Sequence, residues 1–223
     1  MDWQAIWLSI RLAFCTTVVL LVVGVPLAAW LAFSGRRWRF LVEALVALPL
    51  FLPPTVLGFY ILLAIGPRSP LGALYGRVTG SMLPFSFQGL LIASALYSLP
   101  FAVQPVAGAF HAVDRKLVEA SWCLGVSRMA TFRRVIVPLA RQGIATGAIL
   151  SFAHTMGEFG VVLMVGGNIA GVTRTISISI YDQVQALRYD AALETSLLLL
   201  GFSFVVLAVT YALQRRVWIW PMN

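Results

Sequence analysis

Charged residues are scarce in this sequence. Of its 223 residues, 11% are charged and 60% are hydrophobic. Soluble domains carry about 25% charged residues, so this composition excludes an ordinary soluble domain and indicates a membrane protein. A net charge of +8 would suggest nucleic acid in a soluble chain. Here the positive residues lie in short segments between apolar runs, as orientation signals do, so we expect no nucleic-acid partner.

Lysine and histidine are almost absent. Lys116 is the single lysine and follows Arg115, whereas a phosphate-binding loop needs Gly-x-x-x-x-Gly-Lys-Ser/Thr. The chain therefore cannot form that ATP site. His111 and His154 lie in separate segments without a His-Glu-x-x-His arrangement, and no Gly-x-Ser-x-Gly elbow occurs. These absences disfavour an intramembrane enzyme, and we expect no catalytic residue, metal or cofactor in this chain.

Cysteine is the third scarce residue. Cys15 lies in the first apolar run and Cys123 in a basic segment. The two lie at different membrane depths, so we expect no disulfide between them. They are packing residues and say little about compartment.

Long uncharged runs predict the membrane spans. A spanning helix needs about 20 mostly apolar residues. Five segments qualify, with the fourth interrupted by His154 and Glu158: residues 7–33, 41–65, 88–110, 143–165 and 191–213. The first lacks a basic leader and is too long for a signal peptide. The sequence predicts an all-α membrane protein with five transmembrane helices, in a single domain over residues 1–223.

The positions of Lys and Arg predict the orientation. With the N-terminus outside, eleven fall on the cytoplasmic side, in segments 36–39 and 111–142 and at Arg215 and Arg216. Five fall on the other side: Arg11, Arg68, Arg77, Arg174 and Arg188. Because cytoplasmic loops carry the excess of Lys and Arg, we predict that the N-terminus is outside and the C-terminus inside.

Residues 111–142 form a basic island between the third and fourth spans, with six of the sixteen Lys and Arg residues. Apolar residues recur there at helical spacing, first at Val113, Leu117, Ala120 and Leu124, then at Met129, Phe132 and Ile136. Gly125 separates the two sets and Pro138 ends the second. The pattern predicts a short helix, a bend and a second short helix on the cytoplasmic surface, a shape suited to insertion into a partner protein.

Within the island, residues 119–140 (EASWCLGVSRMATFRRVIVPLA) resemble the cytoplasmic EAA loop of the membrane subunits of ABC importers. That pattern is E-A-A, three residues, Gly, nine residues, and an apolar-x-apolar-Pro ending. The matching positions are Glu119, Ala120, Gly125, Val135, Val137 and Pro138. Ser121 replaces the second Ala, and its small side chain should still allow close helix approach.

The resemblance implies the partners. A separate cytoplasmic ATPase dimer would bind ATP and Mg, and two copies of this chain would surround the translocation path. An extracytoplasmic binding protein would deliver the substrate, and alternating access would follow from movement of the coupling segment. The residues that we expect to couple the chain to the ATPase are Glu119, Ala120, Ser121, Leu124, Gly125, Arg128 and Pro138.

Prolines mark two neighbouring spans. Pro49, Pro53 and Pro54 lie in the second, and Pro100 and Pro105 in the third. Prolines kink spanning helices, and such kinks either line a path or serve packing. Pro53, Pro54 and Pro100 are our candidates for the path. Between these spans, residues 66–87 are expected to form an external loop, either a gate or docking surface or a solvated connector.

Glu158 is an acidic residue within the fourth span. At about 1.5 Å per residue from Gly143, it lies roughly 22 Å along the helix, toward the outer side. A carboxylate there is costly unless it is paired, protonated, hydrogen-bonded or in a water-filled cavity. It lies either beside the path or in a structural role. Because a fixed negative charge would repel an anion, we favour a role in holding backbone amides at the outer gate, with His154 as its candidate partner.

The segment after the fourth span carries a second resemblance. Residues 157–160 (GEFG) and 164–175 (MVGGNIAGVTRT) resemble permeases for tetrahedral oxyanions, most closely the molybdate permease family. That family often has N-I-P-G where this chain has Asn168 and Ala170, and we include Asn168 among the path candidates. Arg174 between two threonines suits either an anion site or an interface anchor. Ile176, Ile178 and Ile180 alternate with serines, which predicts an extended or interfacial segment.

The two resemblances imply one function. The chain is expected to be the membrane subunit of an ATP-driven molybdate importer, in contact with lipid in the cytoplasmic (inner) membrane. Permeases for sulfate, thiosulfate or tungstate are the near alternatives. An ion-coupled secondary transporter would need inverted repeats, of which the sequence shows only the similar prolines of the second and third spans.

Overall fold

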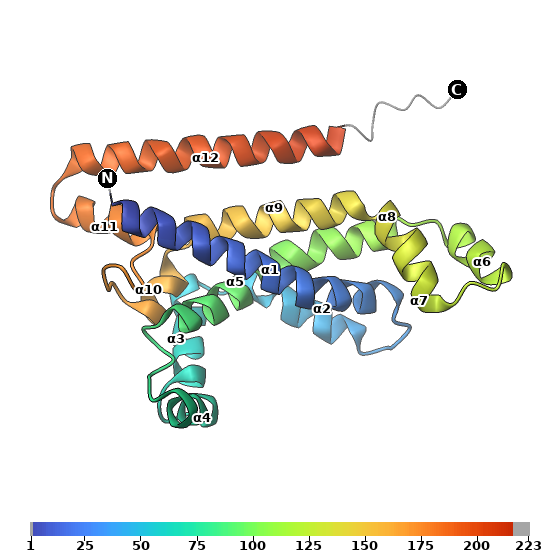
Figure 1. Cartoon of the computed structure of the whole chain (residues 1–223), viewed down its shortest axis with the longest axis horizontal. Helices are drawn as coiled ribbons and strands as arrows, with labels where there is room; N and C mark the ends of the chain where they lie inside the picture. Colours follow the sequence, from blue (N-terminus) through green and yellow to red (C-terminus); the bar gives the residue numbers. More distant parts are fainter. Residues whose placement is uncertain (1, 216–223) are drawn as a thin grey trace.

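The longest helices of the chain run side by side along the molecule, and residues 54–79 project from them to one side (Figure 1). The computed structural model describes residues 2–215, and within them it contains no strand, which confirms the all-α prediction. The helices are α1 (Trp3–Phe33), α2 (Arg39–Ala47), η1 (Leu48–Leu50), α3 (Pro54–Ile65), α4 (Pro70–Thr79), α5 (Phe87–His111), α6 (Arg115–Cys123), α7 (Arg128–Thr131), η2 (Phe132–Ile136), α8 (Val137–Leu139), α9 (Arg141–Gly157), α10 (Gly160–Gly166), α11 (Ile176–Gln185) and α12 (Tyr189–Arg215).

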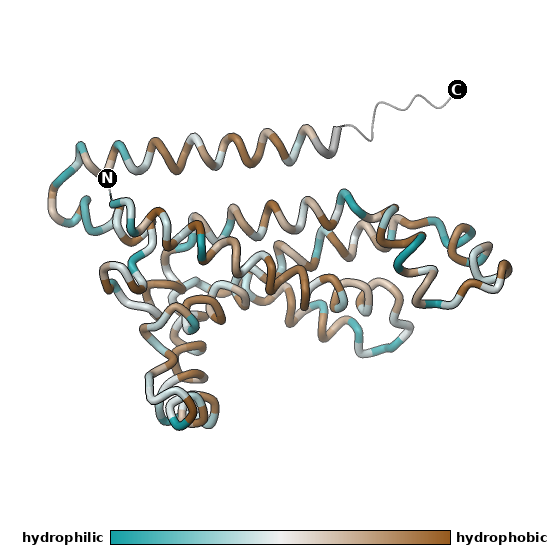
Figure 2. Tube along the Cα trace, in the orientation of Figure 1, coloured by the Kyte–Doolittle hydropathy of each residue, from teal (hydrophilic) through white to brown (hydrophobic). Residues whose placement is uncertain are grey.

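Three of these helices, α1, α5 and α12, are long and apolar enough to cross a membrane. Two bent helix pairs raise the count to as many as five spans: Arg39–Leu50 with Pro54–Ile65, and Arg128–Leu139 with Arg141–Gly157. Figure 2 shows the long helices as mainly hydrophobic, with hydrophilic residues gathered toward their ends. The structure therefore contains three to five apolar segments that could span a membrane, and the predicted number of five stays a prediction.

The connections alternate between the two ends of the molecule. The N-terminus and α11 lie at one end, whereas α6 and α7 lie at the other, toward which α12 runs (Figure 1). Helix α12 therefore runs from the side of α11 toward the side of the basic island. Which of these two sides faces the cytoplasm stays a prediction. Arg216, which contributed to the predicted orientation, lies outside the described residues.

Helices α1, α5 and α9 pack against one another to form the centre of the bundle. Gly143 and Gly147, four residues apart on α9, face Ala109 and Ala102 of α5. A Cβ atom on Gly147 would lie 2.8 Å from the carbonyl oxygen of Ala102. Small residues at this spacing let helix backbones approach closely in membranes, and here they set the distance between α5 and α9.

The second predicted span is broken rather than merely kinked. The segments Arg39–Leu50 and Pro54–Ile65 meet at an angle of 113°. Pro53 caps α3 with ψ of 134°, and Pro54 is its first residue. Neither proline has an N–H group to continue a helix from the preceding turn, and the residue before a proline avoids helical geometry. The kink was predicted, but its size was not.

The fourth predicted span is also broken. Helix α9 ends at Gly157, Glu158 is extended with ψ of 134°, and α10 begins at Gly160. The prediction of one helix over residues 143–165 is therefore wrong. Glycines on both sides of the break lower the cost of leaving helical geometry, a signal that hydropathy does not register.

Two segments predicted without helices contain them. The external loop of residues 66–87 includes α4, which begins at Pro70 behind the Ser69 side chain as N-cap. The segment predicted as extended is α11, where Ile176, Ile178 and Ser179 are buried. The alternation of Ile and Ser was misleading because residues of both types are buried in α11. Buried and exposed positions therefore do not alternate as they would in a strand with one buried face.

Candidate functional site

The basic island folds into the predicted bent pair of helices, which we call the coupling element (residues 115–140). Its first helix is α6; its second part runs through α7, the π-helical turn η2 and α8. Gly125 has φ of +77° at the bend. Gly125 N–H donates to the Trp122 carbonyl and Val126 N–H to the Ser121 carbonyl, at 2.9 and 3.1 Å. These two bonds form a Schellman cap, which requires the left-handed backbone that glycine adopts freely.

A buried hydroxyl pair joins the two parts of the coupling element. Ser121 Oγ and Thr131 Oγ1 lie 2.9 Å apart, and the residues are 8% and 1% exposed. Ser121 is the position where the chain departs from E-A-A. Its small size does preserve the close approach of the helices, as predicted, and its hydroxyl adds a bond that the sequence did not reveal.

The coupling element is anchored on the bundle by aromatic and aliphatic side chains. The rings of Phe132 and Phe110 are 5.7 Å apart, and those of Phe110 and Phe33 are 6.0 Å apart. Ile136 joins the same buried cluster. The coupling element is therefore packed directly against α5 at Phe110, which in turn contacts Phe33 of α1.

The outer surface of the coupling element remains apolar and exposed. Leu117, Leu124 and Met129 are 49%, 84% and 67% exposed. The exposed Arg128 guanidinium lies 5.8 Å from the centre of the Trp122 ring. Apolar side chains of this size in contact with water, beside basic ones, are typical of a surface that binds another protein.

Removing one hydroxyl of the buried pair should destabilise the coupling element. Ser121→Ala leaves Thr131 without its partner, and Thr131→Val leaves Ser121 without its own; each loss costs about 1–3 kcal/mol. We expect both single variants to melt at a lower temperature in detergent. The double variant, which removes both hydroxyls, should recover most of the difference. Single variants with the parental melting temperature would contradict the structural importance of this bond.

A cavity of about 590 Å³ lies within the membrane part of the chain, where the two broken spans meet. It is lined by residues of the α3 start, of α5 and of the α9–α10 break: Pro54, Thr55, Tyr97, Ala153, His154, Gly157, Glu158, Phe159, Gly160, Leu163 and Met164. We call it the junction cavity. Its size falls within the usual range of small-molecule sites, about 300–1,000 Å³.

Two glycines allow the broken spans to meet. A Cβ atom on Gly160 would lie 2.7 Å from Cβ of Pro54, and one on Gly58 would lie 2.8 Å from Cβ of Met164. Any larger residue at these positions would separate α3 from α10. The contact places the starts of both half-helices beside the junction cavity.

Glu158 is buried in this cavity wall without a partner. The residue is 3% exposed, and neither carboxyl oxygen makes a hydrogen bond within the described chain. Ser94 lies close to the carboxyl group, yet its hydroxyl is unpaired as well. The expectation that Glu158 holds backbone amides is therefore wrong, because no backbone N–H of the described chain donates to either carboxyl oxygen.

His154 does not pair with Glu158 as predicted. Its Nδ1 lies 2.9 Å from Ser98 Oγ, and Ser98 Oγ lies 3.0 Å from Thr155 Oγ1. The imidazole ring stacks on Phe101, with ring centres 4.0 Å apart. The break after Gly157 ends the helical spacing that would have placed His154 and Glu158 on one face.

The five residues predicted for the path do not all lie together in the structure. Pro54 and Glu158 line the junction cavity, with Pro53 next to them as the cap of α3. Pro100 is buried inside α5 and does not line the cavity. Asn168 lies on the exposed segment between α10 and α11. The structure thus unites two of the five candidates in one site.

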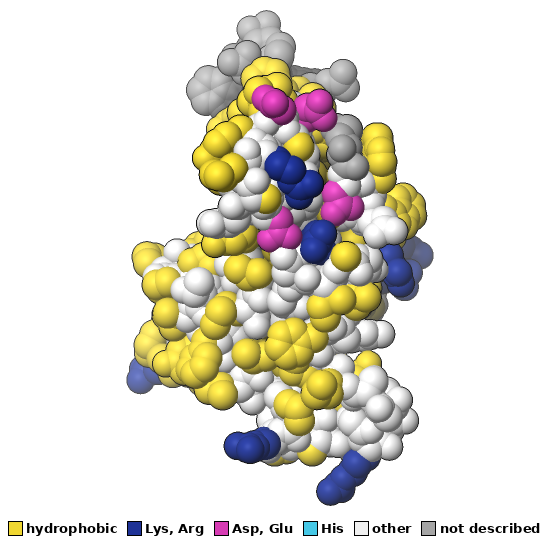
Figure 3. All heavy atoms as spheres, turned by 90° about the vertical axis from the view of Figure 1, so that its left-hand side faces the viewer, with side chains coloured by type: hydrophobic (Ala, Val, Ile, Leu, Met, Phe, Trp, Pro, Cys, Tyr) yellow, Lys and Arg dark blue, Asp and Glu magenta, His cyan; other side chains and the backbone are white. Residues whose placement is uncertain are grey.

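Arg174 and Asn168 belong to a polar cluster at the N-terminal end of the bundle. Arg174 Nε donates to Asn168 Oδ1 at 2.6 Å, and its terminal nitrogens lie 3.6 Å from Asp182 and 3.9 Å from Asp2. Asn168 also donates to Asp182 at 2.6 Å. Figure 3 faces this end and shows acidic and basic side chains gathered together. Because two carboxylates already neighbour Arg174, the cluster ties α1 to α11 and is poorly suited to an anion.

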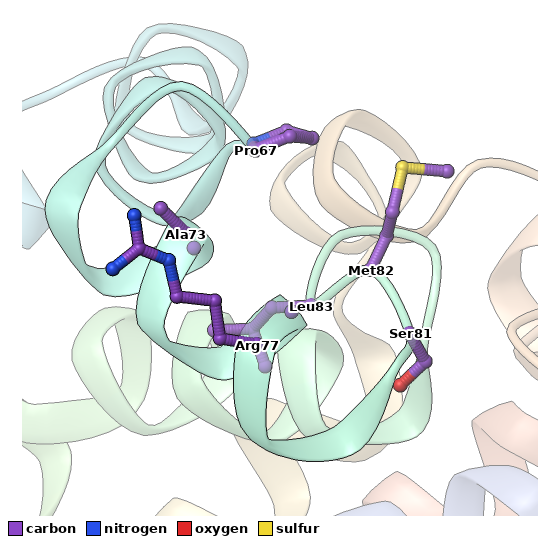
Figure 4. Close-up of a pocket in the computed structure, with 8 residues that line it drawn as sticks. Pro67, Ala73, Arg77, Ser81, Met82 and Leu83 are labelled. Atoms are coloured by element: carbon purple, nitrogen blue, oxygen red, sulfur yellow. The ribbon is translucent and has the colours of Figure 1, made fainter.

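A smaller cavity of about 290 Å³ lies outside the bundle, beside α4. Figure 4 shows Arg77 extending alongside Ala73, with Met82 on the opposite side. Arg77 is its one charged lining residue. Nothing in its lining resembles the buried polar groups of the junction cavity, and we assign it no function.

Comparison with known proteins identifies the family. A family model described as the binding-protein-dependent transport system inner membrane component matches residues 24–219. The chain belongs to this family. This member of the binding-protein-dependent transport family is an inner membrane component, which confirms the predicted location.

Named relatives of this transport-family member are similar over most of their length. The molybdenum transport system permease protein ModB of Azotobacter vinelandii is 50% identical over 214 residues, covering 96% of this chain and 95% of the relative. ModB of Escherichia coli strain K12 is 35% identical over 188 residues, covering 82% of this chain and 80% of the relative. These matches confirm the resemblance to molybdate permeases of ABC importers.

Solved structures share the fold of this family member. The crystal structure of a bacterial ABC transporter for alginate aligns with a TM-score of 0.75 at 17% identity, covering 96% of this chain and 79% of that one. An amino acid ABC transporter aligns with a TM-score of 0.62 at 17% identity, covering 95% of this chain and 92% of that one. The architecture is therefore that of ABC importer membrane subunits.

Sequence reasoning missed several polar residues of both sites. Thr131 in the coupling element and Ser94, Tyr97 and Ser98 on α5 were not singled out. Ser94 and Ser98 are four residues apart in a spanning helix, a spacing that puts them on one face. Serines at this spacing inside a span could have indicated an interior polar face.

Proposed function

We propose that this chain is the membrane-spanning subunit of an ATP-driven molybdate importer, coupled to a separate ATPase. The single observation that carries the proposal is the 50% identity to the ModB protein of Azotobacter vinelandii over nearly the full length of both chains. Importers of sulfate, thiosulfate or tungstate remain the alternatives for the substrate.

The coupling element supports the proposed contact with the ATPase. The Ser121–Thr131 hydrogen bond joins its two parts, and Ile136 packs it against the bundle. Its outer surface is apolar and exposed. We assign the contact to its exposed residues Glu119, Ala120, Leu124, Gly125, Arg128 and Pro138. Ser121 is buried, so its contribution is to hold α6 against α7. ATP and Mg would then be bound by the partner ATPase, and this chain would hold neither.

The complete importer would contain two copies of this chain. Five spans, two of them broken, are few to enclose a path, and a two-fold pair would provide ten. In this arrangement the N-terminus is outside and the coupling element inside, so the substrate-binding protein would dock at the opposite end from the ATPase. The related alginate transporter has been solved in complex with a periplasmic protein that carries its substrate.

Reconstitution tests the proposed function. The chain is incorporated into proteoliposomes with its ATPase, and uptake of labelled molybdate is measured with the binding protein outside and ATP inside. We expect uptake to require ATP and to be competed by tungstate more strongly than by sulfate. Uptake driven by an ion gradient without ATP would indicate a secondary transporter, and preference for sulfate would change the substrate.

Glu119→Lys should uncouple the importer. Glu119 is exposed on α6 and forms no ion pair within the described residues. The substitution therefore leaves the fold intact and reverses a charge at the proposed contact. We expect ATPase co-purification and uptake to fall at least about tenfold, since mismatched charges at an interface cost several kcal/mol. Glu194→Lys, on exposed α12 at the other end, is the matched control and should retain the ATPase. Normal ATPase binding by Glu119→Lys would remove this residue from the interface.

A further inference from the structure

The segment between α1 and α2 combines exposed arginines with an aromatic ring. Residues 34–38 read Ser-Gly-Arg-Arg-Trp, and the side chains of Arg36 and Arg37 are exposed. We call this segment the basic turn. The Arg36 guanidinium carbon lies 5.5 Å from the centre of the Trp38 ring, and that ring lies 5.1 Å from the Trp30 ring of α1. Trp38 therefore packs between the basic turn and α1.

Local hydrogen bonds hold the basic turn in shape. The Arg36 N–H donates to Ser34 Oγ at 3.3 Å, and the Arg36 carbonyl accepts from the Arg39 N–H at 3.1 Å. The Trp38 carbonyl accepts from the Leu41 N–H, also at 3.1 Å. The arginines are therefore presented by a hydrogen-bonded turn.

The charges of Arg36 and Arg37 are not neutralised by the protein. Arg39 forms an ion pair with Glu43, at 2.9 Å between Nε and Oε1. In the part of the chain that the structure describes, neither Arg36 nor Arg37 forms one. Glu43 is the single acidic residue of positions 3–113. An anionic partner would therefore meet two guanidinium groups that have no counter-charge of their own.

The basic turn lies where the spanning helices end. Phe33 is the last residue of α1, and its ring lies 6.0 Å from that of Phe110 in the last turn of α5. Both helices are long and apolar enough to cross a membrane. Figure 1 places their ends toward the side of the molecule that carries α6 and α7. Aromatic and basic residues at the end of a spanning helix lie at the level of the lipid head groups.

Helix α2 continues this surface with apolar side chains. Val42 and Val46 pack against the bundle. Leu41, Leu45 and Leu48 are instead 58%, 66% and 44% exposed. Positions i, i+4 and i+7 share one helix face, so these leucines form a stripe that begins beside the basic turn. The order of the surface, basic and then apolar, is that of a phospholipid read from its phosphate to its acyl chains.

We propose that the basic turn and the leucine stripe of α2 bind an anionic phospholipid, with its phosphate at Arg36 and Arg37 and an acyl chain along the stripe. Guanidinium groups pair with phosphate oxygens through several N–H donors. The stripe decides for a lipid over an acidic protein, because α2 runs from the turn back alongside the spanning helices (Figure 1), where a soluble partner cannot reach. The site is independent of the anion that the importer carries.

Lipid binding to the purified full chain in detergent tests the site, with phosphatidylglycerol and phosphatidylcholine as probes in native mass spectrometry. We expect the parent to bind phosphatidylglycerol more tightly. Arg36→Gln combined with Arg37→Gln should weaken that binding about fivefold for each arginine removed and leave phosphatidylcholine binding unchanged. Equal affinity of the parent for the two lipids would overturn the proposal.

The matched control is Arg68→Gln combined with Arg77→Gln. These arginines are also exposed, and within residues 2–215 they have neither an ion pair nor an aromatic ring beneath the guanidinium group. The control removes the same charge and should bind both lipids as the parent does. A loss of phosphatidylglycerol binding equal to that of the Arg36 and Arg37 variant would show that net charge alone attracts the lipid, and would overturn the site.

Two further variants separate the parts of the site. Arg36→Lys combined with Arg37→Lys keeps both charges, and its affinity for phosphatidylglycerol should stay within about threefold of the parent. Leu45→Gln places a polar group on the exposed stripe, and we expect about fivefold weaker binding at an unchanged melting temperature without lipid. Parental affinity in Leu45→Gln, or a loss in the Lys variant as large as in the Gln variant, would contradict the assignment.

Co-purification of the ATPase identifies the competing occupant. Loss of phosphatidylglycerol binding in the Arg36 and Arg37 double Gln variant, with parental ATPase binding, supports the lipid. Loss of the ATPase with parental lipid binding would place the basic turn in the ATPase contact and overturn the lipid site. Absence of ATP-dependent molybdate uptake in the parent importer would instead refute the proposed function, and it would leave the lipid measurement unaffected.

Discussion

Gly125→Val should abolish ATP-driven uptake while the chain still inserts into the membrane. Gly125 has φ of +77° and closes the Schellman cap of α6. A left-handed backbone costs an ordinary residue about 1–2 kcal/mol, and β-branched residues tolerate it least. No atom lies within 4 Å of a Cβ built at this position. The penalty therefore acts on the backbone of the bend, and relief of it would rotate α6 out of the orientation required for the proposed ATPase contact.

Two variants isolate this backbone effect. Gly125→Asn introduces a side chain that tolerates the left-handed region and should keep most of the uptake. Gly35→Val places the same β-branched residue at an exposed glycine with open space around it and no positive φ, and should be neutral. The measurements are ATP-driven uptake, ATPase co-purification and the amount of chain in the membrane. Full coupling in Gly125→Val would show that the bend tolerates other geometries.

Gly147→Leu should prevent the bundle from assembling. The first side-chain carbon at this position would already lie 2.8 Å from the Ala102 carbonyl oxygen and 3.1 Å from Val106. Overpacking a well-packed core costs about 1–3 kcal/mol even when the neighbours are flexible side chains, and here the neighbour is backbone. We expect α5 and α9 to separate, with loss of the junction cavity and of the anchor for the coupling element.

The readout for this variant is assembly rather than transport. Yield after detergent extraction, a single species in gel filtration and the melting temperature should all fall, and uptake should be lost with them. Gly201→Leu on α12 is the control, because nothing lies within 4 Å of a Cβ at that glycine. A Gly147→Leu protein with parental yield and melting temperature would contradict the proposed role of the glycine contact. Gly125→Val differs from it by remaining assembled.

Local signals in the sequence were sufficient for three of the predicted spans and for the bend of the coupling element. Hydropathy located α1, α5 and α12, because burial in lipid demands long apolar stretches. Spacing of apolar residues and one glycine predicted the bend at Gly125, because a helix cap depends on residues within one turn. Free cysteines were also predicted, and Cys15 and Cys123 are unpaired in the structure.

Predictions that depended on distant neighbours were less successful. Arg174 could have been an anion site or an anchor, and its contacts with Asp2 and Asp182 decided for a structural role. His154 and Glu158 were paired on helical spacing, and the break after Gly157 separated them. Patterns within a few residues cannot indicate where packing against a distant segment interrupts a helix.

The sequence by itself determined that this chain is a helical membrane protein without an ATP-binding loop, with a bent basic segment facing one side. Those properties follow from composition and from contacts within a few residues. Only the tertiary structure decided that the breaks at Pro53 and Glu158 meet in one cavity, and that Ser121 bonds Thr131. Such contacts join separate segments of the chain, and they form because glycines and small residues let particular helices approach.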